Sequence, residues 1–261
     1  MFKLISKLKN KGNLWPYFFE FFTVLLSVYL AFLLTEWREN HKEQQETKLA
    51  IERLNQEIFQ NYREIISFKK DVAQRLHKMQ LIEKIIEPNI SFNDYIGVFN
   101  GFRYVRFSTA SWKRIGDSKI GNLMPVDYLD WAHDLYRSNE HLNQHNLIIN
   151  DLMYSNMNFD PKKCKIAYHI AELYVWQQAV WAIDDVYNYT QFIQKYKQDF
   201  EYLLKQDSTV NAYFISRDSL TPDKLKDLLK KEAREINSLR KSEKMDAIRS
   251  KIKSLKTQAV Q

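Results

Sequence analysis

The chain has 261 residues, a formal net charge of +7, and a composition that is 45% hydrophobic and 14% aromatic. This length, less an N-terminal anchor, leaves enough chain for one sizeable domain. The single cysteine, Cys164, excludes an intramolecular disulfide, so the fold must be held by packing. With only 5 glycines and 5 prolines, long stretches lack a helix breaker, which predicts an all-α protein.

The positive charge lies at the two ends of the chain. Residues 1–14 carry four lysines and no acid, and residues 221–261 carry 12 basic and 6 acidic side chains, which leaves a net −3 between them. A nucleic-acid-binding protein places its positive field on a folded face. We therefore expect no nucleic-acid ligand and favour membrane surfaces or acidic partners, with residues 1–14 as a basic interfacial segment.

Residues 15–37 are predicted to form a transmembrane helix. Residues 21–34 carry no charge, and the hydroxyls of Thr23 and Ser27 can bond back to carbonyls of the same helix. Trp15 and Trp37 bracket the segment at roughly 33 Å, the spacing of two interfacial aromatic belts. An export signal would need a small-x-small cleavage site, which is absent after the apolar run, and a buried core helix is the remaining alternative.

Glu20 is the one charged residue between Trp15 and Leu34. An acid within a span is costly unless it meets a partner or lies near the interface. Two interpretations stay open. Glu20 is either an interfacial residue that benefits from the helix macrodipole or a contact between subunits in the membrane.

Two stretches resemble a family of uncharacterised single-pass bacterial membrane proteins. The first is the pattern formed by Glu20, Ala31, Trp37 and Glu39, and the second is STASWKRIGDSKIGNLMPVDYLDWAHDLY at residues 108–136. Phe19 stands where that family has a glycine, and Glu36 where it has an asparagine. The resemblance implies the membrane anchor and no particular activity.

The orientation of the span is predicted by comparing the lysines and arginines on its two sides, because the cytoplasmic flank of a membrane helix carries an excess of them. Four lysines precede the span, against Arg38, Lys42 and Lys48 in the first fifteen residues after it. This small excess favours a cytoplasmic N-terminus. We expect a single-pass protein of the bacterial inner membrane whose C-terminal domain is periplasmic or otherwise extracytoplasmic.

Residues 38–88 are predicted to form a stalk and the first helix of a bundle, without a glycine or proline from 17 to 87. The membrane-proximal sequence WRENHKEQQETK has no apolar stripe, which is typical of a solvated spacer. Beyond it, apolar residues recur every three or four positions and predict a packed face: Ile51, Leu54, Ile58, Tyr62, Ile65, Val72, Leu76 and Met79.

Residues 89–124 form an irregular, glycine-containing region. Alternation between residues 95 and 107 allows a short strand or hairpin. Ser108 or Thr109 is placed to cap a short helix that Gly116 closes.

The bundle continues over residues 125–220, with one helix from Pro125 to about residue 158 and another from Pro161 to about 206. Residues 221–261 form a basic amphipathic helix that starts with Thr221 as N-cap and Pro222 as first residue. The predicted fold is thus all-α: a single N-terminal transmembrane helix continuing into a stalk, an antiparallel helical bundle and one irregular loop.

Five cations of the irregular region are candidate anion ligands: Arg103, Arg106, Lys113, Arg114 and Lys119. Backbone N–H groups of neighbouring glycines and hydroxyl residues can assist them. The region lacks the Gly-Lys-Ser/Thr ending of a phosphate-binding loop. A surface loop whose arginines pair with bundle carboxylates is the plainer alternative.

His141 and His145 lie one turn apart on a predicted helix, as zinc ligands can. The residue after His141 is Leu142, where a metalloprotease helix has glutamate. A solvated or hydrogen-bonded histidine pair is the structural alternative. We expect no cofactor.

Together these patterns predict a membrane-anchored helical scaffold or accessory subunit that acts through protein–protein interaction without catalysis. Its expected partners are the lipid bilayer and either a second copy of the chain or another membrane protein. One alternative is a membrane-tethered sensory or ligand-binding module with an anion site in residues 103–119. A second alternative is a metal-dependent hydrolase that uses His141 and His145.

Overall fold

The computed structural model describes residues 15–83, 105–116, 118–154, 161–218, 220 and 222–238. Within these ranges the regular elements are all helices, which confirms the predicted all-α class. The basic segment 1–14 and most of the possible hairpin at 95–107 lie outside the described residues. The chain divides into two compact units, residues 1–50 and 51–261.

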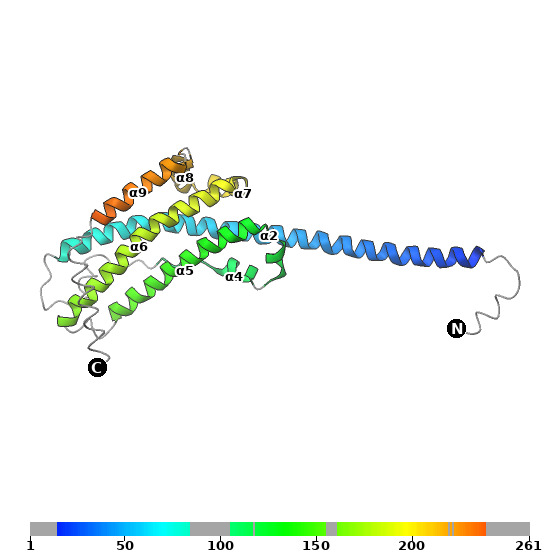
Figure 1. The fold of residues 1–261 in the computed structure, drawn as a ribbon, viewed down its shortest axis with the longest axis horizontal. Helices are drawn as coiled ribbons and strands as arrows, with labels where there is room; N and C mark the ends of the chain where they lie inside the picture. The colour runs from blue at the N-terminus through cyan, green and yellow to red at the C-terminus, as the bar shows by residue number, and fades with distance from the viewer. Residues whose placement is uncertain are drawn as a thin grey trace. The chain divides into compact units, whose positions relative to one another are not determined.

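The described part of the first unit is the N-terminal portion of helix α2 (Trp15–Glu83), drawn in blue in Figure 1. Every side chain of residues 15–46 is exposed, including the whole uncharged stretch 21–34. The hydroxyls of Thr23 and Ser27 donate to the carbonyls of Phe19 and Thr23 at 2.8 and 2.7 Å, as predicted. Within the described residues, α2 is the helix long and apolar enough to cross a membrane.

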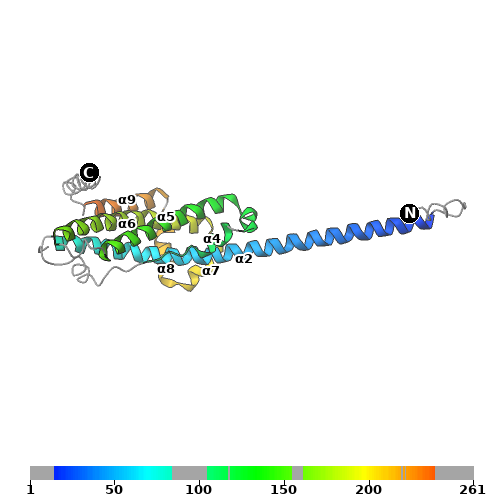
Figure 2. The ribbon, with the colours of Figure 1, turned by 90° about the horizontal axis from the view of Figure 1, so that it is seen from below.

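The second unit is a helical bundle whose longest members are α2 from residue 51 onward, α5 (Val126–Tyr154), α6 (Pro161–Lys195) and α9 (Pro222–Ser238). Helix α6 packs against both α5 and α9 (Figures 1 and 2). The periodic stripe predicted on α2 is its core face, because seven of its eight residues are buried: Leu54, Ile58, Tyr62, Ile65, Val72, Leu76 and Met79. The eighth, Ile51, is half-buried.

The helix predicted from Pro161 to residue 206 is wrong in one respect, since the structure divides it in two. Helix α6 ends at Lys195, and α7 (Lys197–Gln206) follows Tyr196, whose φ and ψ are −109° and 32°. No glycine or proline marks this break. The Tyr196 ring lies 5.0 Å from that of Tyr128 and 4.9 Å from that of Phe192, so aromatic packing holds the bend.

Helix α8 (Ser208–Asp218) was not predicted. Asp207 starts it, because its Oδ1 accepts the N–H groups of Thr209 and Val210 at 3.1 and 3.0 Å, the pattern of an aspartate N-cap. Helix α9 begins at Pro222 as predicted. Its expected cap Thr221, and the rest of the predicted helix after residue 238, lie outside the described residues.

Candidate functional site

Residues 105–109 form a non-helical segment that asparagine side chains hold between α2 and α5. Asn61 of α2 accepts the N–H of Ser108 and donates to its carbonyl, both at 2.9 Å. Asn143 of α5 does the same for Phe107, at 3.2 and 3.3 Å. Each amide thus satisfies both polar groups of one backbone residue, as a neighbouring strand would.

Glu57 of α2 fixes the start of the short helix α4 (Ala110–Gly116) and is only 6% exposed. Its Oε2 accepts the N–H of Ser111 at 2.9 Å and the hydroxyl of Ser108 at 2.8 Å, and its Oε1 accepts the hydroxyl of Tyr136 at 2.6 Å. Burial alone would raise the pKa of Glu57, but these hydrogen bonds outweigh it and lower the pKa.

The short helix closed by Gly116 is therefore confirmed. Thr109 is its N-cap residue, one of the two predicted, because its carbonyl accepts the N–H of Lys113 at 3.1 Å. However, Thr109 does not supply the side-chain oxygen that accepts the N–H of Ser111. A carboxylate more than fifty positions earlier supplies it instead, which no local pattern around residue 108 reveals.

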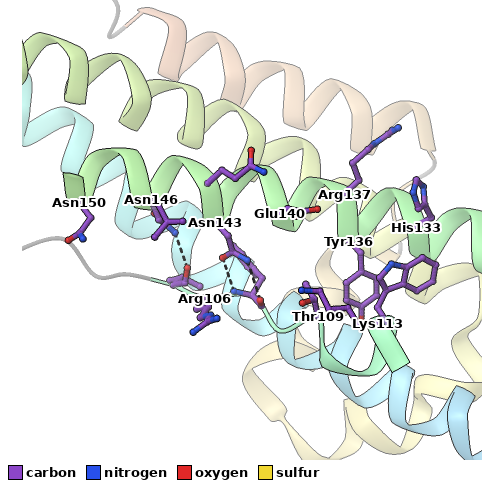
Figure 3. A pocket seen from close by; sticks show the side chains of 15 residues that line it. Arg106, Thr109, Lys113, His133, Tyr136, Arg137, Glu140, Asn143, Asn146 and Asn150 are labelled. Carbon is purple, nitrogen blue, oxygen red and sulfur yellow. Dashed lines mark hydrogen bonds between the residues drawn. The ribbon is translucent and has the colours of Figure 1, made fainter. Parts of the chain in front are cut away.

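A groove of about 730 Å³ is lined by the segment 105–113 on one side and by helix α5 on the other, beside the hydrogen bonds that join the two (Figure 3). The α5 wall is one face of that helix, polar except for Leu147, with residues recurring every three or four positions: His133, Arg137, Glu140, Gln144, Leu147 and Asn150. The opposite wall is made by Arg106, Thr109, Trp112 and Lys113. The Trp112 ring stacks on that of Tyr136, with centroids 5.2 Å apart and planes at 9°, so this end of the groove is aromatic.

The groove carries more positive than negative charge. Arg106 and Lys113 are exposed, and neither has an ion-pair partner among the described residues. Arg137 is shared with Asp134 at 2.9 Å, and Glu140 is the one carboxylate in the lining. Arginine and lysine in such a position attract carboxylate and phosphate groups.

The five cations predicted as anion ligands separate in the structure. Arg106 and Lys113 line the groove, Arg114 and Lys119 are exposed but do not line it, and Arg103 lies outside the described residues. The α5 wall was not predicted. Its signal in the sequence is the polar face of a helix whose other face carries Leu135, Leu142 and Ile149, all buried.

The predicted histidine pair lies against aromatic rings. The rings of His141 and His145 lie 5.9 and 4.5 Å from that of Trp181, and His145 also meets Tyr174 edge to face at 4.9 Å. Burial lowers the pKa of His145, and His141 lowers it further. No three His, Cys, Asp or Glu residues come together within the described ranges, so the metal site stays a prediction.

Trp15, Glu20 and Trp37, the predicted membrane residues, all lie on the exposed surface of α2. Trp15 and Trp37 are 71% and 66% exposed, and they are 22 positions apart on one helix. Their interfacial roles and the intramembrane contact of Glu20 stay predictions.

A layer of buried polar side chains joins α5 to α6. Asn139 and Tyr189 exchange two hydrogen bonds at 2.7 and 3.0 Å, and Ser138 donates to Asp185 Oδ1. The second oxygen of Asp185 is buried without a partner among the described residues. Burial raises the pKa of Asp185 to about 7, with the Ser138 hydrogen bond opposing the shift and Asp184 adding to it.

No known protein family, characterised protein or solved structure matched the chain. Function is therefore inferred from the residues and their contacts.

Proposed function

We propose that the chain is a single-pass, membrane-anchored helical scaffold or accessory subunit that acts through protein–protein interaction rather than catalysis. The observation that carries this proposal is helix α2, which is 69 residues long without a break. Its first part has a window of mean hydropathy 2.0 with no buried side chain, and its second part has a stripe buried in the bundle. Exposed apolar surface on that scale needs a lipid environment.

In this proposal residues 15–37 span the bacterial inner membrane. Four lysines before the span and three basic residues just after it favour a cytoplasmic N-terminus, with the bundle on the other side. The resemblance of Glu20, Trp37 and Glu39 to the pattern of single-pass bacterial membrane proteins supports the anchor. The resemblance adds no activity.

Glu20 indicates the kind of partner. A carboxylate within a span is stabilised by a second polar group, and a single-pass chain obtains that group from the interface or from another chain. We therefore favour a second copy of the chain, with a different membrane protein as the alternative.

The test is purification of the full-length chain from its native membranes in mild detergent, followed by mass measurement of the intact assembly. A stoichiometric second protein or a homo-oligomer supports the proposal, and a monomer contradicts it. Glu20→Gln is expected to weaken the assembly, because an amide is a poorer partner than a carboxylate for a charged or strongly donating group. If Glu20→Gln assembles like the wild type, the contact assigned to Glu20 is wrong.

Topology needs an introduced cysteine, because Cys164 is only 3% exposed. Lys205 has a side chain that is 71% exposed on α7, so Lys205→Cys in a Cys164→Ala background offers an accessible thiol. An impermeant maleimide should label this variant in intact cells with a permeabilised outer membrane. Labelling only after lysis would place the bundle in the cytoplasm and reverse the proposed orientation.

A further inference from the structure

We propose that the groove between residues 105–113 and helix α5 binds a small anionic ligand rich in hydroxyl groups, of the class of phosphorylated or acidic sugars. Its volume of about 730 Å³ lies within the range of roughly 300–1,000 Å³ that is typical of small-molecule sites. The site does not depend on how the chain is anchored.

The anionic group of the ligand is recognised by Arg106 and Lys113. Both belong to the same wall, both are exposed, and neither is neutralised by a described carboxylate. A ligand phosphate or carboxylate would replace water on these cations with charge-assisted hydrogen bonds. Arg137 lies on the α5 side of the groove, pairs with Asp134 at 2.9 Å, and extends away from Arg106 and Lys113, so it is not assigned to the anionic group (Figure 3).

The hydroxyl groups of the ligand are recognised by Glu140, Gln144 and Asn150 on the α5 wall. These side chains have no hydrogen-bond partner among the described residues, so their acceptors and amide donors are available. The carboxylate accepts hydrogen bonds, and each of the two amides both accepts and donates. This combination suits sugar hydroxyls, because each hydroxyl is both donor and acceptor. Glu140 also disfavours a ligand that is purely a compact anion, because like charges repel.

Both walls are held in place without a ligand. Asn61 and Asn143 fix the backbone of residues 107 and 108 from two helices, and Glu57 fixes the start of α4, which carries Trp112 and Lys113. A ligand therefore does not have to order the segment when it binds. Such preorganisation lowers the free-energy cost of binding.

The experiment is thermal unfolding of the full-length protein in detergent with glucose 6-phosphate, glucuronate, glucose or sulfate. Glucose 6-phosphate or glucuronate at ten times its dissociation constant is expected to raise the melting temperature by about 3–5 °C. Glucose and sulfate at the same concentrations should raise the melting temperature by less than about 1 °C. Glucose has hydroxyls for the α5 wall but no anionic group, and sulfate has the anionic group for Arg106 and Lys113 but no hydroxyls. No shift with either acidic sugar, or an equal shift with sulfate, overturns the proposal.

Variants separate the groove from general charge effects. Arg106→Ala and Lys113→Ala are each expected to weaken binding about tenfold or more, since each loses a charge-assisted hydrogen bond. Arg114→Ala is the matched control, because it removes the same charge one position from Lys113 and outside the groove lining. If Arg114→Ala weakens binding as much as Lys113→Ala, the shift reflects net charge and the groove is not the site.

Discussion

The hydroxyl of Tyr136 donates to Glu57 Oε1 at 2.6 Å and so joins α5 to α2 across 79 positions of sequence. The other oxygen of the same carboxylate holds the first turn of α4 through the N–H of Ser111. Burial raises the pKa of Tyr136, and its hydrogen bond to Glu57 raises it further, so the phenol stays protonated as the donor. One buried carboxylate therefore connects three elements of the bundle.

Replacing Glu57 with glutamine should destabilise the bundle by about 2–4 kcal/mol. The amide keeps the shape of the side chain but directs an N–H₂ group at one of the donors that the carboxylate accepts. Urea unfolding of the full-length protein in detergent, followed by tryptophan fluorescence, measures the change. Glu52→Gln, at an exposed position of α2, is the control. Equal losses in the two variants would contradict the role of Glu57.

The pKa of Glu57 also predicts a pH dependence. Because its pKa is lowered in the folded state, its stabilising contribution is present above the unfolded value of 4.5 and is lost as the pH falls through the folded value. The free energy of unfolding of the wild type should therefore fall more steeply below pH 4.5 than that of Glu57→Gln. Parallel curves for the two proteins would show that the carboxylate is not selectively stabilised.

The asparagine clamp around residues 107 and 108 should control local opening of the segment. Asn143→Ala removes both hydrogen bonds to Phe107 and is expected to cost about 1–3 kcal/mol and to speed amide hydrogen exchange at residues 105–109. Gln144→Ala, at the exposed neighbouring position, should change neither quantity. Unchanged exchange in Asn143→Ala would mean that the clamp does not hold the segment.

The sequence predicts the core face of α2 and the start of α9 well, because both depend on local patterns. Apolar residues recurring from Leu54 to Met79 define a buried stripe wherever the partner helices lie. Pro222 has a fixed φ that suits a first helical turn. Such features need no knowledge of the rest of the fold.

The break at Tyr196 and the side-chain acceptor at the start of α4 were missed because they depend on tertiary contacts. Tyr196 bends the chain against rings contributed by α5 and α6, and Glu57 reaches α4 from a distant helix. The α5 wall of the groove was missed for the same reason. Arg106 and Lys113 could be singled out by charge, whereas Glu140 and Gln144 join them only once α5 packs beside the segment.

Phe192 occupies the centre of the aromatic cluster at the junction of α6 and α7. It is fully buried, and its ring contacts those of Tyr128, Trp131, Tyr196 and Phe200. Phe192→Ala should lower the free energy of unfolding by about 3–5 kcal/mol, since it removes a large ring and leaves a cavity. Tyr202→Ala removes an aromatic side chain that is 68% exposed on α7 and should cost under about 1 kcal/mol. Similar losses would mean that the cluster is loosely packed.

Asp185 predicts a pH dependence of the opposite sign from that of Glu57. Its pKa is about 7 in the folded state against 3.8 for an unperturbed aspartate. Between pH 3.8 and 7, therefore, Asp185 is protonated in the folded protein and ionised in the unfolded chain. Stability is therefore greatest below the unfolded value and is lost as the pH rises toward 7, by on the order of 4 kcal/mol.

The groups that face Asp185 are the Ser138 hydroxyl, the neighbouring Asp184 and the buried phenol of Tyr189, whose pKa Asp185 itself raises. Asp185→Asn removes the titrating group and keeps an oxygen for Ser138, so between pH 5 and 8 its unfolding free energy should fall less with pH than that of the wild type and should exceed it at pH 8. Asp130→Asn, at an exposed position of α5, should retain the slope of the wild type. Urea unfolding at a series of pH values measures these slopes, and equal slopes for the wild type and Asp185→Asn would contradict the raised pKa.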